Sequence, residues 1–425
     1  MYGLLTIGSF MGMLAAGMPI FLSLGVLSLI LIYSEGTPLI AYPQIFVDHL
    51  ESDTLVAIPF FVLAATFMQR GGIAKALVEC ATVWIGSLRG GLALVCVAAT
   101  TIFAAISGSS IATAMAMGTL LVPAMVERSY SRPFALGVVG ASGTLGILIP
   151  PSLPMIVYAV IAEESIPRLF LAGVVPGLLQ AALFSIWIIF FTWRKGYPSE
   201  ERVNAPVFIS TNLQALPALS LPVIILGGIY SGIVTVSESA GLAALVSIIV
   251  ALFVYKGCTI RDLPEIVGHS VRTTASIIFI VMTAGAFAHW IVGSGVSDNL
   301  VDFVENSQLK AWQFLLFINI LLLALGMFLE VFAVILITMP IVLPLLGPLG
   351  INPIHFAIVL MVNMEVALLT PPIGMNLYVL STITSSRIAD VIRGVGPFVV
   401  IMLILLLLVT FVPEISLFLP GYIFG

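Results

Sequence analysis

Two tandem prolines inside apolar stretches constrain this chain more than any other feature of its sequence. The first pair is Pro150-Pro151 and the second is Pro371-Pro372. Proline lacks a backbone N–H and its ring clashes with the preceding turn, so each pair ends a helix. In a segment that spans lipid, the backbone groups freed by such a break persist only where they are buried in protein or line a cavity. Each pair therefore predicts a broken helix whose unwound residues are buried in protein or line a cavity.

The composition predicts an integral membrane protein. The chain is 60% hydrophobic and 8% charged, with a mean hydropathy of +1.22, whereas a soluble domain carries about 25% charged residues. Several stretches longer than the roughly 20 residues of a spanning helix contain no Asp, Glu, Lys or Arg, namely 1–34, 90–126, 133–162, 169–193, 203–237 and 331–364. We therefore expect a multi-pass bundle in a lipid bilayer. No basic patch indicates a nucleic acid partner.

The two proline pairs belong to an internal repeat. They are separated by a constant offset (371 − 150 = 221). The same offset relates three further pairs, Pro123 with Pro344, Gly173 with Gly394, and Pro176 with Pro397. Interruptions at corresponding positions of two halves are typical of transporter binding sites. We predict a first repeat over 1–195, a cytoplasmic linker and an extra span over 196–235, and a second repeat over 236–425.

The charges predict that the two repeats are inverted. Lys and Arg residues near span ends lie preferentially in the cytoplasm. Arg89 and Arg128 bracket the stretch 90–126, so both of its ends are expected there, with the polar turn at 107–110 between them. The flanks of the corresponding stretch 311–346 are poor in basic residues, so this second hairpin should open to the outside. The extra span crosses the membrane once between the two repeats. The second repeat therefore starts on the opposite side of the membrane and is inverted relative to the first.

The expected fold is an all-α integral membrane fold with inverted structural repeats, two re-entrant helical hairpins and two broken helices. The stretches 73–88 and 296–309 are amphipathic and come directly before the two hairpins. Amphipathic segments of this kind lie in the membrane interface. We interpret them as hinge-like arms that hold a moving unit.

A cation site is predicted where each hairpin tip meets a break. The tip at 107–110 offers hydroxyl and carbonyl oxygens, and the break at 146–151 offers unwound carbonyls. Such converging neutral oxygens are suited to Na⁺. The corresponding set in the second half is Gly326 at the tip with Ala367, Thr370 and Ile373 at the break. Thr370 carries the only hydroxyl there. The alternative is that these small residues only allow close helix packing.

An anionic substrate is predicted from the half-helices that follow the breaks. Their N-termini, near Ser152 and Gly374, direct partial positive charge at the centre of the membrane. Polar side chains available to a substrate nearby are Ser109, Ser110, Asn363 and Asn376. The alternative for each is a hydrogen bond between helices.

Three carboxylates lie within otherwise apolar sequence, where an ionisable group is a functional candidate by default. Glu330 lies beside the second tip and Glu365 just before the second break, so each could pair with a cation or a buried partner, or couple protons. Glu238 is interpreted as a helix N-terminal cap. We place His269 and His355 in connections between helices and assign them no metal role.

The sequence provides little for catalysis. It has neither the phosphate-binding motif GxxxxGK[ST] nor the zinc protease motif HExxH. We therefore predict no catalytic residues and no organic cofactor. An intramembrane enzyme is kept as a remote alternative.

Four segments resemble the large, DctM-like membrane subunit of TRAP (tripartite ATP-independent periplasmic) transporters. They are GILIPPS at 146–152, GIYSGIVTVSE at 228–238, ILITMP at 335–340 and LTPPIGMN at 369–376. The similarity covers essentially the whole chain, and the first and last segments together are quite specific.

The resemblance implies import of a small organic anion, a carboxylate or sulfonate, across the bacterial inner membrane, driven by the Na⁺ gradient. It implies an elevator mechanism, in which a transport domain, mainly 90–165 and 311–386, slides against a scaffold formed by the rest. The family's two Na⁺ sites would correspond to Ser107, Gly146, Ile149 and Pro151, and to Gly326, Ala367, Thr370 and Ile373.

The resemblance also implies two protein partners. One is a small membrane subunit, and the other is a soluble periplasmic binding protein that delivers the substrate. The alternative is a stand-alone Na⁺/anion symporter of similar architecture that needs no binding protein.

Overall fold

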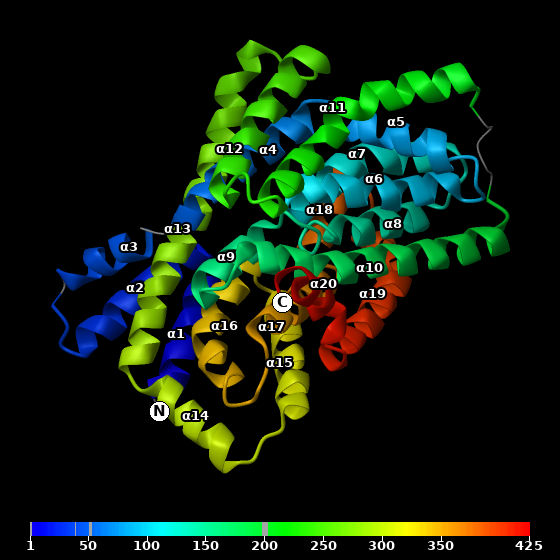
Figure 1. Ribbon diagram of the computed structural model, residues 1–425. Helices are drawn as coiled ribbons and strands as arrows, with labels where there is room; N and C mark the ends of the chain where they lie inside the picture. Colours follow the sequence, from blue (N-terminus) through cyan, green and yellow to red (C-terminus); the bar gives the residue numbers. More distant parts are fainter. Residues whose placement is uncertain (1, 39, 51–52, 198–202) are drawn as a thin grey trace.

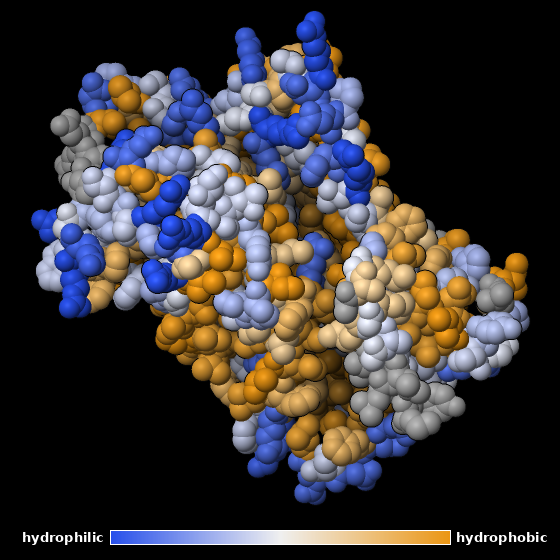
Figure 2. Space-filling view, turned by 180° about the vertical axis from the view of Figure 1, so that it is seen from behind, coloured by the Kyte–Doolittle hydropathy of each residue, from blue (hydrophilic) through white to orange (hydrophobic). Residues whose placement is uncertain are grey.

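The chain folds into helices throughout the part described by a computed structural model, residues 2–38, 40–50, 53–197 and 203–425. Within these residues, six helices are long and apolar enough to cross a membrane. A seventh span results if the bent pair Thr54–Arg70 and Ile73–Ile85 is counted as one. Figure 2 shows hydrophobic side chains over the middle of one face and hydrophilic side chains gathered toward its ends. The expected all-α membrane fold is confirmed.

The first half of the chain contains one hairpin and one broken helix (Figure 1). Its elements are α1 (Tyr2–Ala15), α2 (Ile20–Ser34), α3 (Ala41–Leu50), the 3₁₀ turn η1 (Asp53–Val56), α4 (Ala57–Arg70), α5 (Ile73–Ile85), α6 (Gly91–Ser107), α7 (Ser110–Glu127), α8 (Arg132–Thr144), α9 (Leu153–Ala162) and α10 (Ile166–Lys195). Helices α6 and α7 form the first hairpin, and α8 and α9 are the two parts of the first broken helix.

The second half repeats this order of hairpin, broken helix and long helix, and α11 lies between the two halves. Its elements are α11 (Ala205–Tyr230), α12 (Val236–Ile249), the π-helical turn η2 (Val250–Val254), the 3₁₀ turn η3 (Ile260–Asp262), α13 (Leu263–Gly293), α14 (Val296–Asn306), α15 (Ala311–Gly326), α16 (Val331–Leu346), α17 (Pro353–Leu368), α18 (Met375–Ile383), α19 (Ile388–Phe411) and α20 (Glu414–Phe424). Helices α15 and α16 form the second hairpin, and α17 and α18 the second broken helix. Both amphipathic stretches are helical, as α5 and α14.

The reversal of the chain at the tip of the first hairpin follows from the residues at the tip. Helix α6 is followed by Gly108 at its C-cap position, and the φ of 58° at Gly108 lies in the left-handed region that glycine tolerates. The next residue, Ser109, caps α7 because its hydroxyl accepts a hydrogen bond from the backbone N–H of Ala112, 3.4 Å between heavy atoms. The chain therefore reverses within the polar turn at 107–110.

Each broken helix packs against a long helix of the other half. Helix α8 lies along α19, and α17 contacts α10. At the α8–α19 contact, a Cβ added to Gly137 or to Gly394 would collide with the backbone of the opposite helix. The first break is buried over 145–152, whereas Pro371, Pro372 and Ile373 of the second break are exposed.

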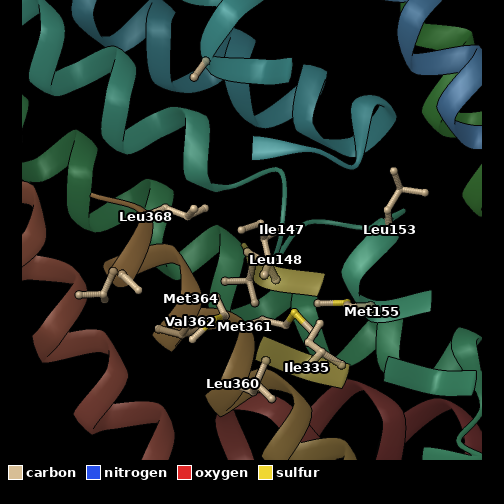
Figure 3. Close-up of a cluster of buried hydrophobic side chains, with 14 of the residues drawn as sticks. Ile147, Leu148, Leu153, Met155, Ile335, Leu360, Met361, Val362, Met364 and Leu368 are labelled. Carbon is tan, nitrogen blue, oxygen red and sulfur yellow. The ribbon is translucent and has the colours of Figure 1, made fainter. Parts of the chain in front are cut away.

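Apolar side chains hold the two breaks in one core. Ile147 and Leu148 of the first break belong to the same buried cluster as Met364 and Leu368 of α17. Figure 3 shows these side chains converging from the two broken helices. The first unwound segment is thus enclosed in protein, as backbone at membrane depth requires, whereas the second is covered only in part.

The repeat is visible in the positions of the helices. Helix α8 begins at Arg132 and α17 at Pro353, which gives the offset found in the sequence (353 − 132 = 221). The division of the chain into 1–195, 196–235 and 236–425 stays a prediction. Within the expected linker, residues 198–202 lie outside the described residues.

The cap expected at Glu238 is confirmed, although the residue in the N-cap position is Thr235. The hydroxyl of Thr235 accepts a hydrogen bond from the backbone N–H of Glu238 at 3.2 Å. The Glu238 carboxylate accepts one from the backbone N–H of Thr235 at 2.8 Å. This reciprocal pair is a capping box at the start of α12.

The placement of two histidines in connections is wrong. His269 lies inside α13, because a capping box between Thr259 and Asp262 starts helical structure well before it. His355 lies in the first turn of α17, where Asn352 accepts hydrogen bonds from the backbone N–H groups of Ile354 and His355. In both cases a short polar cap sets a helix start that apolar periodicity alone does not reveal.

Inverted repeats predict opposite labelling at two exposed positions. Ser129 lies between α7 and α8, and Pro348 between α16 and α17. A cysteine at Ser129 should react with a membrane-impermeant maleimide only from the cytoplasm, and one at Pro348 only from outside. Native background should be low, because Cys80, Cys96 and Cys258 are buried. Labelling of both engineered positions from the same side would disprove the inversion.

The close contact between α8 and α19 predicts a large stability difference between two glycines of one helix. Gly394→Ala places a Cβ against backbone atoms that cannot move aside, and we expect a loss of about 1–3 kcal/mol. Gly396→Ala is the matched control, since its Cβ would meet nothing within 4 Å. Thermal unfolding of the detergent-solubilised protein measures both. Equal melting temperatures for the two variants would contradict the packing described here.

Candidate functional site

A cavity of about 370 Å³ lies where the two hairpin tips meet. The first tip contributes residues 107–112 and the second contributes residues 330–332. Ile147, Leu153 and Leu368, next to the breaks, close one side. Helices α4 and α13 close the other. The cavity therefore joins elements from both halves of the chain.

The first tip contacts the first break through backbone. The N–H of Leu153 donates a hydrogen bond to the carbonyl oxygen of Gly108, 3.3 Å away. A Cβ on Gly108 would lie 2.8 Å from the carbonyl oxygen of Pro151. A Cβ on Gly146 would lie 2.9 Å from the carbonyl oxygen of Ser109. Glycine at both positions lets the tip and the break approach this closely.

Hydroxyl groups gather at this first contact. The Ser107 and Thr113 hydroxyls are 2.6 Å apart, and Thr113 also donates to the Ser109 carbonyl at 2.7 Å. The position of Gly146 leaves only 3.1 Å between an added Cβ and the Thr113 hydroxyl. Three residues of the first predicted Na⁺ set, Ser107, Gly146 and Pro151, thus come together. Thr113 was missed, although it follows Ser109 by one helical turn.

The fourth residue of the first set contributes differently. The side chain of Ile149 is buried and packs with Ala104, Ala105 and Leu145. Only its backbone carbonyl could act as an oxygen ligand.

The second tip contacts the second break in the same way. The N–H of Gly374 donates to the carbonyl oxygen of Met327 at 3.4 Å. Gly374 and Leu153 are related by the repeat offset (374 − 153 = 221). At the tip, a Cβ on Gly326 would lie 2.7 Å from the Cβ of Ala367. Gly326 and Ala367 of the second predicted set are therefore neighbours.

The other two residues of the second set are less enclosed. The Thr370 hydroxyl donates to the carbonyl oxygen of Val366 at 2.7 Å, which leaves its own lone pairs available as acceptors. The side chain of Ile373 is 40% exposed, so only its backbone could be a ligand. The second set thus depends more on backbone than the first.

A buried hydrogen bond joins the two halves at the cavity wall. The Asn376 amide donates to the Ser110 hydroxyl at 2.6 Å, and both side chains are buried. Ser109 and Ser110 line the cavity. Three of the four predicted substrate residues are therefore brought to one place. The Asn376 side-chain oxygen has no hydrogen-bond partner.

Asn363, the fourth, lies elsewhere. Its amide donates to the backbone and side-chain oxygens of Asn319 at 3.0 and 2.9 Å. Asn319 in turn donates to the Thr410 hydroxyl at 3.0 Å. This buried network links α15, α17 and α19, and Asn363 is not among the cavity residues. For Asn363, the structure therefore shows the alternative given from the sequence, a hydrogen bond between helices.

The first turns of three helices line the cavity. They belong to α7, α9 and α16, entered at Ser110, Leu153 and Val331. Their N-terminal ends carry partial positive charge, which favours an anion. The start of α9 was predicted for this role. The start of α18 was also predicted, but Met375 does not line the cavity.

The two buried carboxylates occupy different places. Glu330 lines the cavity at the N-cap position of α16, and its side chain makes no capping hydrogen bond. Glu365 is fully buried in α17 and does not line the cavity.

The wall formed by α4 and α13 was not found from the sequence. It carries five polar side chains, Thr66, Gln69, His269, Thr273 and Ser276. The three on α13 recur at helical spacing on one face of an apolar helix. That periodicity is a signal that sequence reasoning could have used.

Among the described residues, no group of three or more His, Cys, Asp or Glu side chains is arranged to hold a metal ion. The oxygens gathered at the two tip-to-break contacts are hydroxyls and carbonyls. Such neutral oxygens suit hard cations, an alkali cation among them, better than zinc or copper, which prefer nitrogen and sulfur ligands.

Comparison with known proteins agrees with this architecture. Residues 7–415 match the model of the family described as "Tripartite ATP-independent periplasmic transporter, DctM component". A C4-dicarboxylate TRAP transporter large permease protein of Pseudomonas aeruginosa is 41% identical over 373 residues, covering 88% of this chain and 87% of that protein. The isethionate TRAP transporter permease protein DctMQ of Oleidesulfovibrio alaskensis is 38% identical over 416 residues, covering 97% of this chain and 66% of that protein.

Solved structures show the same fold at low identity. MtrF of Neisseria gonorrhoeae aligns with a TM-score of 0.62 at 12% identity, covering 90% of this chain and 83% of MtrF. The sequence relatives are named as transporter permeases, so this chain is a transport protein and not an enzyme. With a family model matched over nearly its whole length, the chain belongs to the DctM family, the large permease component of tripartite ATP-independent periplasmic transporters.

Proposed function

We propose that this chain imports a small organic anion, a carboxylate or a sulfonate, across the bacterial inner membrane and couples that import to the Na⁺ gradient. The observation that carries the proposal is the cavity between the two hairpin tips, lined by serine hydroxyls and by three helix N-termini. Hydroxyls and helix N-termini bind anions without requiring a fixed cation. The relatives from P. aeruginosa and O. alaskensis are named for a C4-dicarboxylate and for isethionate, a sulfonate.

Sodium ions would be held where each tip meets its break. In the first half, the Ser107 and Thr113 hydroxyls lie beside the carbonyls around Gly146 and Pro151. In the second half, Thr370 supplies a hydroxyl next to backbone oxygens of the break. An ion that binds a tip and a break together stabilises the contact between them. Because the cavity is lined by the two tips, Na⁺ occupancy would then set the shape of the cavity. This arrangement couples Na⁺ binding to substrate binding.

The transport step would be an elevator movement. The two hairpins and two broken helices, within 90–165 and 311–386, form the proposed moving domain. Helices α4 and α13 belong to the proposed scaffold and close the cavity on one side. Sliding of the domain past these helices would carry the cavity across the membrane while the tip-to-break contacts stay intact. The amphipathic helices α5 and α14, directly before the hairpins, would act as the connecting arms.

A small membrane subunit and a periplasmic binding protein would complete the transporter. The family description is that of a tripartite system, of which this chain matches one component. The DctMQ relative is longer than this chain, which covers 66% of it. A binding protein that delivers the substrate would set much of the substrate choice. A stand-alone symporter would need neither partner, which makes reconstitution decisive.

Reconstitution tests the tripartite proposal directly. Proteoliposomes containing this chain and its small subunit should accumulate labelled succinate or isethionate only when an inward Na⁺ gradient and the cognate binding protein are both present. Without the binding protein, no substrate is delivered to the cavity, so uptake should be abolished. Without the Na⁺ gradient, transport has no driving force, so uptake should also be abolished. Uptake by this chain alone would instead establish the stand-alone symporter.

Thr370 supplies a second, finer test. Thr370→Ala removes the only side-chain hydroxyl of the second site, and we expect the Na⁺ concentration for half-maximal uptake to rise roughly fivefold, corresponding to about 1 kcal/mol. Thr370→Ser is the matched control, because it keeps the hydroxyl that now donates to Val366. Uptake against a Na⁺ titration measures all three proteins. An unchanged half-saturation and rate in the alanine variant would reject a ligand role.

A further inference from the structure

A second cleft lies away from the cavity between the hairpin tips and shares no residue with it. Its volume is about 390 Å³, and it lies between α5 and the end of α7, with one residue each from α6 and α11. These four helices lie together at the upper right of Figure 1. Arg89 and Arg128 predict that this end of the first hairpin lies on the cytoplasmic side. The cleft therefore lies near the cytoplasmic surface of the membrane.

The wall formed by α5 carries a polar stripe. Lys75, Glu79 and Thr82 line the cleft and recur at helical spacing, so they lie along one side of α5. Another side of the same helix, which includes Ile73 and Leu77, is buried in the core. The polar side of this amphipathic helix thus faces the cleft.

The wall formed by α7 is apolar. Leu120, Leu121 and Ala124 line it, and Leu92 of α6 and Val83 of α5 extend it. Leu120 is exposed, and α7 is long and apolar enough to cross a membrane. The apolar wall is therefore continuous with the surface that lipid chains cover. A ligand that fills this cleft must be polar on one side and apolar on the other.

A tryptophan indicates the depth of the cleft in the membrane. Trp84 directly follows Val83, a residue of the cleft, and its side chain is 63% exposed. Its indole N–H donates to the side-chain oxygen of Asn212 at 2.8 Å, which joins α5 to α11. Tryptophans are enriched at the level of the lipid headgroups. The cleft therefore lies at headgroup depth.

The charges that line the cleft favour an anion. Lys75 and Arg128 contribute two positive charges and Glu79 one negative charge, so the net charge is +1 (2 − 1). The Lys75 ammonium lies 3.8 Å from the Glu79 carboxylate, and the two side chains are 69% and 50% exposed. Such an exposed ion pair is weak, so Lys75 remains able to bind another anion. The hydroxyl of Thr211 is a further polar group of the cleft.

A helix of another membrane protein fits this cleft less well than a lipid does. Its apolar side chains would remove Lys75 and Arg128 from water without a counter-charge, which is unfavourable. The phosphate of a lipid headgroup accepts hydrogen bonds from ammonium and guanidinium groups alike. Basic pockets between membrane helices on the cytoplasmic side bind lipid headgroups in this way.

We propose that this cleft binds an anionic phospholipid. Its phosphate lies between Lys75 and Arg128, and the upper part of an acyl chain lies against Leu120, Leu121 and Ala124. One negative charge on the lipid balances the net charge of the cleft. The lipid contacts α5 and α7 together, which are the arm and part of the moving hairpin in the proposed function, but its binding does not depend on that function.

Lipid binding to the purified complex tests this site. The complex of this chain with its small subunit is stripped of lipid in detergent and titrated with phosphatidylglycerol, and native mass spectrometry measures the bound lipid. We expect Lys75→Met and Arg128→Met each to weaken the binding of one phosphatidylglycerol about fivefold. Lys195→Met is the matched control, because it removes the same charge from an exposed position in the last turn of α10, outside the cleft. It should bind phosphatidylglycerol as the wild type does.

Glu79→Gln should change the affinity in the opposite direction. It raises the net charge of the cleft to +2, so we expect phosphatidylglycerol to bind about fivefold more tightly. A cleft that holds zwitterionic phosphatidylethanolamine would behave differently, because the ammonium of that lipid would pair with Glu79. Weaker binding of phosphatidylethanolamine to Glu79→Gln, with no gain for phosphatidylglycerol, would overturn the proposal.

Three further outcomes would contradict an anionic lipid in this cleft. Equal phosphatidylglycerol affinity in Lys75→Met and the wild type would show that Lys75 binds no headgroup. Equal weakening in Lys75→Met and Lys195→Met would show only a general attraction between the lipid and a basic surface. Binding to this chain alone that is lost in the complex would show that the small subunit covers the cleft.

Discussion

The contact between a hairpin tip and an unwound break is the interaction on which the rest of this structure depends. In each half, the backbone N–H two residues after the proline pair donates to a carbonyl of the tip, from Leu153 to Gly108 and from Gly374 to Met327. A break at membrane depth frees backbone groups that lipid cannot satisfy. In each half, the tip satisfies one of these groups. The same contact gathers the hydroxyls and carbonyls of the proposed Na⁺ sites.

The two contacts are related by the repeat, but they are not equivalent. The first break is buried throughout, and its tip brings Ser107 and Thr113 against it. The second break is exposed along Pro371, Pro372 and Ile373, and its tip has no hydroxyl. An ion at the second contact would therefore be held more loosely and exchange more readily with solvent. That asymmetry fits one site that maintains the structure and one that responds to the Na⁺ gradient.

Much of the fold and part of the site could be predicted from local chemistry. Tandem prolines end helices wherever they occur, and the polar turn at 107–110 reverses the chain through Gly108 and a serine cap. These are effects of neighbouring residues, so sequence is sufficient to see them. The role of Asn363 was not predictable in this way. It has the same chemistry as Asn376, yet one faces Asn319 and the other faces Ser110.

The sequence by itself determined that the chain is a membrane bundle, where its helices break and that its two halves are related. These properties follow from composition, proline stereochemistry and a constant offset. Only the tertiary structure decided which polar groups meet. His269 became part of the cavity wall, and Asn376 was brought against Ser110 of the other half. These contacts depend on how helices that are far apart in the sequence rotate and pack against each other. Neighbouring residues in the chain do not determine that packing.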